Sequence, residues 1–205
     1  TGALDLNAPI TSATSLSVSG VSNLGANVTT SGTQTYLAAT TLSGGARTLQ
    51  GSTIQTVAVG GAQNLTITGN LDLNGAIGAS TRVGVFSVSG ASNLGANVLS
   101  NGTQTYTGAV TLSADITLTS SDDQFTFSST VQSDGTARDL TLSAGSGTIG
   151  ITGAIGGNSK PLDVLTITQS GGVTFSDVIN ADTVTLTDTT GSVTFAGSTV
   201  LETLN

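Results

Sequence analysis

The sequence predicts an all-β fold, a parallel β-helix (β-solenoid) of about 20 residues per coil, in which each coil lies on the previous one. Three observations indicate this fold. Residues 17–36, SVSGVSNLGANVTTSGTQTY, return at 87–106 as SVSGASNLGANVLSNGTQTY. The stretch GGVTFSD at 171–177 returns one coil length later, at 191–197, as GSVTFAG. Apolar and polar residues alternate in short runs along the chain, and a period of two is typical of strands with one buried face.

The first element in chain order is a large internal repeat. Residues 17–44 and 87–114 are identical at 20 of 28 positions, and LDLNAPI at 4–10 is matched by LDLNGAI at 71–77. A fainter match joins GAIG at 75–78 to GAIG at 153–156. We therefore predict one β-helical rod over residues 1–205, with large repeats at about 4–70, 71–148 and 149–205. Close repetition is typical of stacked structures, because each unit must present the same surface to its neighbour.

The individual strands are predicted from pairs of apolar residues that lie two positions apart. Turn residues such as Asn74-Gly75, Asn101-Gly102 and Asp134-Gly135 separate them. The pairs recur about every six to nine residues, so about three strands fill a coil, whereas hairpin sheets need longer strands. Nine or ten coils that rise about 4.8 Å each predict a rod about 45 Å long. The pairs are Val57/Val59, Leu65/Ile67, Leu71/Leu73, Val110/Leu112, Ile116/Leu118, Phe125/Phe127, Leu140/Leu142, Ile149/Ile151, Leu165/Ile167, Val173/Phe175, Val184/Leu186 and Val193/Phe195.

Composition excludes several classes of function. Charged residues make up 8% of the chain and aromatics 3%, and the net charge is -8. A negative surface repels phosphate backbones and anionic lipid, so we expect no nucleic-acid partner and no membrane insertion. Abundant Val, Ile, Leu and Thr argue against a disordered linker. The chain starts at Thr1 rather than Met, which leads us to expect a processed product or an excerpt from a longer protein.

Three segments carry a likeness to a known family. They are GTQTYTGAVTLSADITLTS at 102–120, FTFSSTV at 125–131 and LTLSAGSGTIGITGAIG at 140–156. Together they resemble the repeats of very large bacterial surface proteins, the filamentous-haemagglutinin-like and related β-strand-repeat adhesins. The resemblance implies a right-handed helix, a location outside the cell or on the bacterial cell surface, and a structural or adhesive role without catalysis. It also implies contacts with host or neighbouring-cell surfaces or glycans.

The expected function is therefore a non-catalytic structural segment, an adhesin shaft or extracellular filament. The alternative is a β-helix that binds or degrades polysaccharide. Such a site needs clustered carboxylates, cations that stabilise developing charge, and aromatics that stack on sugars. The chain has no His or Trp, and its basic residues are dispersed at positions 47, 82, 138 and 160. Tyr36 and Tyr106 occupy the same place in the repeat, which favours a structural column, so we predict no enzyme and no catalytic residue.

Calcium is the only cofactor that the sequence brings into consideration, because calcium prefers several carboxylate and carbonyl oxygens. The candidate ligands are Asp122, Asp123, Asp134 and Asp139. The chain lacks the glycine-rich nonapeptides that bind calcium in other solenoids. Asp122 and Asp123 are adjacent, so they converge only in a turn. We expect acidic turns that aid solubility, with no cofactor and no dedicated metal site.

Two further surface patterns have an alternative interpretation. Thr-x-Thr at 117–119 and 183–187 is compatible with an ice-binding array, but ice-binding solenoids repeat that array in nearly every coil, so ordinary solvent-facing strands are favoured. Asn27, Asn64 and Asn101 stand in Asn-x-Thr sequons, which arise easily by chance in a Thr-rich chain.

The two ends of the chain carry strand patterns rather than caps. LDLNAPI begins at residue 4, and VTFAGSTVLETLN continues to residue 205. An uncapped coil leaves backbone N–H and C=O groups unpaired, and such edges template further pairing. We therefore expect further β-helical repeats, or identical subunits stacked end to end, as the partners of both ends.

Overall fold

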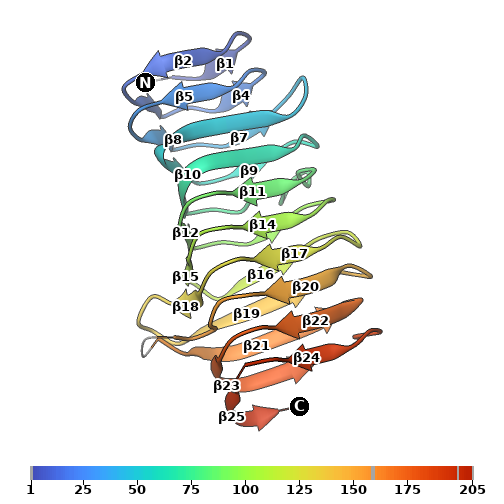
Figure 1. Ribbon diagram of the computed structural model, residues 1–205. Helices are drawn as coiled ribbons and strands as arrows, with labels where there is room; N and C mark the ends of the chain where they lie inside the picture. Colours follow the sequence, from blue (N-terminus) through green and yellow to red (C-terminus); the bar gives the residue numbers. More distant parts are fainter. Residues whose placement is uncertain (1, 158–159, 198, 205) are drawn as a thin grey trace.

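The computed structural model describes residues 2–157, 160–197 and 199–204. In these ranges every named strand pair is parallel and no helix occurs. The coils stack one below another into a rod that runs from the N-terminal to the C-terminal end (Figure 1). The predicted fold is confirmed as a parallel β-solenoid of about ten turns, roughly 20 residues apart.

Three faces run along the rod. Face 1 contains β1 (Leu4–Leu6), β4 (Ser22–Leu24), β7 (Thr40–Leu42), β9 (Val59–Gly60), β13 (Val98–Leu99), β16 (Ile116–Thr119), β19 (Arg138–Ser143) and β21 (Leu162–Gln169). Face 2 contains β2 (Ile10–Ala13), β5 (Val28–Thr30), β11 (Phe86–Val88), β14 (Gln104–Tyr106), β17 (Phe125–Phe127), β20 (Thr148–Ile151), β22 (Gly172–Phe175) and β24 (Val193–Phe195). Face 3 contains β3 (Leu16–Val18), β6 (Gln34–Tyr36), β12 (Ser92–Leu94), β15 (Val110–Leu112) and β18 (Val131–Ser133).

Four longer strands turn a corner and belong to two faces. Strands β8 (Arg47–Thr56) and β10 (Leu65–Leu73) pass from face 2 to face 3, and β23 (Ile179–Leu186) and β25 (Thr199–Leu204) pass from face 3 to face 1. The bend in β10 lies at Gly69, whose φ is +129°. A Cβ there would stand 1.8 Å from the carbonyl oxygen of Gly51 in the preceding coil. Only glycine lets the two corners approach this closely.

The coil length varies from one turn of the rod to the next. A short coil takes the chain from Ile54 to its stacking partner Leu71, and a long one takes it from Leu140 to Leu165. Stacking fixes only the inward side chains, so the corner loops absorb the extra residues at little entropic cost. The period read from the sequence is therefore an average of unequal coils.

The predicted apolar pairs point inward with few exceptions. Pairs such as Leu65/Ile67, Val110/Leu112 and Ile149/Ile151 are buried, as alternation requires. The assignment of Val57 to a strand is wrong, because this residue lies outside β9 and is half-buried. Stacking the inward residues coil on coil builds one continuous core along the rod.

The aromatic stacks of this core lie under face 2. All five Phe residues of the chain belong to its strands. The rings of Tyr106 and Phe127 stack at 5.0 Å with 4° between their planes, and Phe175 and Phe195 stack at 5.1 Å. Such pairs stabilise by about 0.5–1.5 kcal/mol beyond the area that they bury. In the described part of the chain, the inner side of face 2 is thus the one lined by stacked aromatic rings.

The large repeat is out of phase with the coil. In the first copy, β4, β5 and β6 lie on faces 1, 2 and 3, whereas their counterparts β12, β13 and β14 lie on faces 3, 1 and 2. The two copies are thus offset by about three and two-thirds turns, and the second copy is rotated by one face. The same sequence fits either position because the inward pattern is the same on each face.

Candidate functional site

The four calcium candidates do not converge. Asp122 and Asp123 lie in the turn between β16 and β17, Asp134 follows β18, and Asp139 lies in β19. Within the described ranges, no three acidic side chains come close enough to hold a metal ion. The expectation that Asp122 and Asp123 lie in a turn is confirmed, since Asp122 has a left-handed φ of +64°.

Each of three candidate carboxylates has a structural partner. Asp122 Oδ1 accepts a hydrogen bond from the Ser146 backbone N–H at 2.9 Å, and Asp139 Oδ1 accepts one from Val164 N–H at 3.1 Å. Asp134 pairs with Arg138, which donates from Nη2 to Oδ2 at 3.0 Å and from Nε to Oδ1 at 3.2 Å. Hydrogen bonding from the Arg138 guanidinium lowers the pKa of Asp134. These three carboxylates therefore stabilise corners and turns through hydrogen bonds within the protein, without a metal ion.

Other Asn and Asp side chains along the rod also accept a hydrogen bond from a backbone N–H group of the next coil. This role was not predicted from the sequence. Their Oδ1 atoms accept a backbone N–H from the next coil, where a corner would leave that donor unpaired. In the sequence, these residues can be found as an Asn or Asp directly before an inward apolar residue, as in Asn-Val, Asn-Leu and Asp-Ile. The pairs are Asn27 with Thr48 at 3.0 Å, Asn64 with Val85 at 2.8 Å, Asn97 with Thr117 at 2.7 Å and Asp115 with Asp139 at 3.1 Å.

This role bears on two of the three sequons. Asn27 and Asn64 are exposed, but their side-chain oxygens are already engaged in these corner bonds. Asn101 lies in an exposed bend, where its backbone N–H donates to Val83 O at 2.7 Å. Of the three, Asn101 has the side chain whose modification would disturb the corner bonds least.

A buried polar network joins Gln104 to Tyr106. The Tyr106 hydroxyl donates to Gln104 Oε1 at 2.9 Å. Gln104 Nε2 donates to Val98 O at 3.2 Å, to Ser100 Oγ at 3.1 Å and to Thr119 O at 2.8 Å, and the last belongs to the next coil. The network satisfies a glutamine in the interior and ties two coils together.

The first copy of the repeat contains the same network on a different face. Tyr36 donates to Gln34 Oε1 at 3.0 Å, and Gln34 Nε2 donates to Val28 O at 3.2 Å and to Gln50 O at 2.7 Å. Both tyrosines are buried, and burial raises the pKa of each hydroxyl well above its usual range. The prediction of a structural role for the tyrosines agrees with this burial. The two tyrosines lie in different columns, because Tyr36 lies on face 3 and Tyr106 on face 2.

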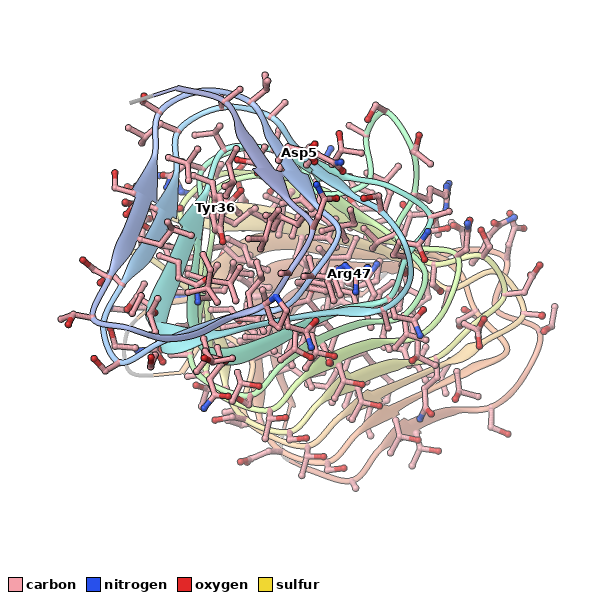
Figure 2. All side chains as sticks on the ribbon, turned by 90° about the horizontal axis from the view of Figure 1, so that it is seen from above. Asp5, Tyr36 and Arg47 are labelled. Atoms are coloured by element: carbon pink, nitrogen blue, oxygen red, sulfur yellow. The ribbon has the colours of Figure 1, made fainter. Side chains whose placement is uncertain are left out.

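Arg47 is a charged residue in the interior. Figure 2, which looks along the rod, shows Tyr36 and Arg47 directed into the coil. Arg47 Nε donates to Leu24 O at 2.9 Å, Nη1 donates to Ala46 O at 2.7 Å, and Nη2 contacts Ser43 O. Carbonyl oxygens therefore satisfy this guanidinium, and it is enclosed rather than presented to a substrate.

An acidic hollow with a volume of about 330 Å³ lies where face 1 turns into face 2. Asp122 and Asp188 line it, and both have left-handed φ values, +64° and +47°. The remaining lining residues are Gly145, Ser146, Gln169 and Thr190, so the lining contains no cation. Such a hollow repels an anionic polysaccharide and lacks a cation that would stabilise negative charge in a transition state.

The described ranges contain no helix that is long and apolar enough to cross a membrane. No protein-family model, curated protein or solved structure matches the chain.

Proposed function

We propose that the chain is a non-catalytic structural segment of a fibrous protein that is secreted or displayed on a bacterial cell surface, as an adhesin shaft or extracellular filament. One observation supports this most strongly. The segment that contains the Gln–Tyr network builds face 3 in one copy and face 2 in the other, with the same bond between the tyrosine hydroxyl and the glutamine. A segment that serves equally on two faces is selected for how it stacks, whereas a catalytic site depends on one fixed asymmetric arrangement.

The likeness of 102–120, 125–131 and 140–156 to the repeats of filamentous-haemagglutinin-like adhesins supports the extracellular part of the proposal. The interior supports the structural part. Continuous apolar columns and aromatic stacking give a stiff rod, which is what a shaft requires. The acidic surface keeps such rods apart in solution.

The alternative function, binding or cleavage of polysaccharide, receives less support. A sugar-binding cleft uses exposed aromatic faces, and Tyr36 and Tyr106 are both buried. Three of the four candidate carboxylates, those of Asp122, Asp134 and Asp139, are bonded to the backbone or to Arg138. Incubation with acidic and neutral polysaccharides should therefore release no products. Release of oligosaccharides by the purified chain would contradict the structural proposal.

The partner that we propose for the N-terminal end of the described rod is a further β-solenoid coil, of the same polypeptide or of a second copy. Leu4 and Leu16 are only partly buried there, whereas their repeat counterparts Leu71 and Phe86 are buried. A hollow of about 230 Å³ opens beside them, lined also by Gly2, Ala3, Ser17 and Val18. Another coil would cover this apolar surface and pair the outer edge of β1.

Two experiments test the proposal. Antibodies raised against residues 1–205 should label intact producing cells, or fibres around them, in electron micrographs. Labelling that requires permeabilised cells would refute the extracellular location. Light scattering of the purified chain should show end-on oligomers, and a monomer that is stable at all concentrations would refute stacking between copies.

A further inference from the structure

The outer surface of face 2 differs from the rest of the rod in its chemistry. Strands β8, β10, β11, β14, β17, β20, β22 and β24 lie one below another on this face (Figure 1). Their outward side chains form two columns that we call the hydroxyl face. The central column is Thr48, Thr66, Ser87, Thr105, Thr126, Gly150, Thr174 and Thr194. The second column is Gln50, Thr68, Ser89, Thr107, Ser128, Thr152, Ser176 and Ala196.

The hydroxyl face continues for eight coils without a charged side chain, although the chain has a net charge of -8. Thirteen of its sixteen residues are Thr or Ser, and the other three are Gln50, Gly150 and Ala196. The sequence motif Thr-x-Thr alone does not reveal this array, because most coils present Thr-x-Ser, Ser-x-Ser or Thr-x-Thr and only the fold aligns them. The two columns of this face are therefore uncharged over all eight coils.

The hydroxyls of this face are available to solvent. Thr105 and Thr126 are half-buried between their neighbours, and Thr107 and Ser128 are exposed. In the described part of the chain, none of these four hydroxyls is hydrogen-bonded to the protein, whereas Ser87 donates to Thr66 at 3.3 Å. A parallel sheet places such groups about 4.8 Å apart between strands and about 6.6 Å apart along a strand. The result is a two-dimensional lattice of methyl and hydroxyl groups.

The other two faces lack this combination. Face 1 has a register column of Thr117, Thr141, Thr166 and Thr185, but Asp115 and Asp139 lie beside it. On face 3, the outward column includes the charged Asp72, which is bonded to its neighbours. Gln55 Nε2 donates to Asp72 Oδ2 at 2.9 Å, and Asn93 Nδ2 donates to Asp72 Oδ1 at 3.0 Å.

The chemistry of the hydroxyl face fits few ligands. Nucleic acid requires a basic surface. Protein interfaces are enriched in aromatic residues, Met and Arg and are depleted in Ser, and their energetic centres are rarely Ser or Thr. Glycans stack on exposed aromatics, which these two columns lack. An uncharged lattice of methyl groups, which order the water around them, and hydroxyl groups, which anchor it, fits an ordered water layer.

We propose that the hydroxyl face binds ice. The surface of an ice crystal is itself a regular lattice of water oxygens, so a rigid array with a similar repeat can hold many of them at once. The aromatic stack behind the face, in which Tyr106 and Phe127 lie 5.0 Å apart, keeps the strands in a fixed register. A rigid array loses little entropy on binding, which is why preorganisation favours adsorption.

The test uses the purified chain and three matched substitutions. Thr126→Lys and Thr111→Lys replace the central, half-buried threonine of β17 on face 2 and of β15 on face 3, two strands with the same burial pattern. Thr141→Lys places the same charge on face 1. Circular dichroism and melting temperature verify that each variant folds. Two readouts are then measured, namely uptake of the protein into a growing ice shell and thermal hysteresis at a single ice crystal.

We expect the unmodified chain to enter ice and to shape the crystal. Thr126→Lys should reduce both readouts to the level of a protein that does not bind ice, while Thr111→Lys and Thr141→Lys retain them. Thr174→Lys, in another coil of face 2, should repeat the loss and protects the test against an unfolded first variant. Exclusion of the unmodified chain from ice would overturn the proposal. So would equal effects of all substitutions, or a change of oligomeric state in Thr126→Lys without any change in ice uptake.

Discussion

Replacing Gln104 with Leu tests the buried network most directly. Leu has a similar volume, so the substitution removes the amide's contacts with Tyr106, Val98, Ser100 and Thr119 without opening a large cavity. Two of the partners keep other bonds, because Thr119 O still receives Ser100 N–H at 2.9 Å and Ser100 Oγ still donates to Gly102 O at 2.6 Å. The Tyr106 hydroxyl, in contrast, loses the acceptor to which it donates. An orphaned buried hydroxyl and the lost bonds together should cost about 2–4 kcal/mol of unfolding free energy.

A second substitution separates the hydroxyl from the packing. Tyr106→Phe in the Gln104→Leu background removes the orphaned donor and should recover about 1–3 kcal/mol, because two apolar partners of the same shape are nearly neutral. Tyr106→Phe alone should destabilise, since it leaves Gln104 Oε1 without its donor. The coupling energy in the double-mutant cycle is this recovery plus the cost of Tyr106→Phe alone, so its magnitude should be at least about 1–3 kcal/mol.

Urea unfolding followed by circular dichroism measures these changes. Repeat rods can unfold in segments, so amide exchange near Ser100 should accompany the global measurement. The first copy of the repeat supplies an internal control, because Gln34→Leu and Tyr36→Phe alter the same network on face 3. Both cycles should agree in sign and within about 1 kcal/mol. A silent Gln104→Leu, or a Tyr106→Phe that recovers nothing, would show that the network does not contribute as argued.

Three further predictions concern the core, pH and metals. Val184→Lys should cost about 3–5 kcal/mol because Val184 is fully buried, whereas its outward neighbour Thr185→Lys should stay within about 0.5 kcal/mol, and equal urea midpoints would disprove the assignment of the strand faces. Unfolded tyrosine ionises near pH 10 while Tyr36 and Tyr106 stay protonated in the fold, because burial raises the pKa of each. Stability should therefore fall as the pH rises above about 10, and less in the Tyr36→Phe/Tyr106→Phe variant. EDTA should leave the melting temperature unchanged, because Asp122 already has a backbone partner, and a drop of several degrees would restore the calcium hypothesis.

Local alternation was sufficient to predict the fold. Pairs such as Leu65/Ile67 have a period of two, their spacing is too short for hairpins, and the return of GGVTFSD as GSVTFAG gives the coil length. Gln104 and Arg47 follow the same rule, since each lies two positions before a buried side chain, Tyr106 and Leu49. Their polarity, taken alone, favours the solvent side of a strand. Their burial could have been predicted from alternation, but their partners could not, because the carbonyls that they contact belong to other strands and turns.

The surface was less predictable because it depends on register between coils. Coils such as the one from Ile54 to Leu71 and the one from Leu140 to Leu165 differ in length, so no fixed shift along the sequence aligns the outward residues. Asp122 and Asp134 are close in the sequence, but they lie at different corners. Conversely, Thr126 and Thr174 belong to one column although they lie two coils apart. Sequence spacing alone therefore could not decide which acidic side chains meet or which hydroxyl groups align.

The rotated repeat leads to the last prediction, which concerns deletion of residues 17–86. The junction joins Leu16 to Ser87, and residues 87–106 then take the places of 17–36. Strand β1 would pair with β12 instead of β4, and Leu16 would stack on Gln104 instead of Gln34. Every inward contact has an equivalent, although all later strands rotate by one face.

We expect the shortened chain to fold as a β-solenoid, about 18 Å shorter because about three and two-thirds coils are missing. It should melt cooperatively at a somewhat lower temperature, since a rod with fewer coils has fewer stabilising interfaces. Deletion of residues 17–76 is the matched control, because the face 3 residue Leu16 would be followed directly by the face 1 residue Ile77, without the rest of β3 and the turn that lead from face 3 to face 1 in the intact rod. Small-angle scattering gives the length, and circular dichroism gives the fold. If both deletions fold equally well, or if neither folds, the faces are not interchangeable units and the main support for a structural role is lost.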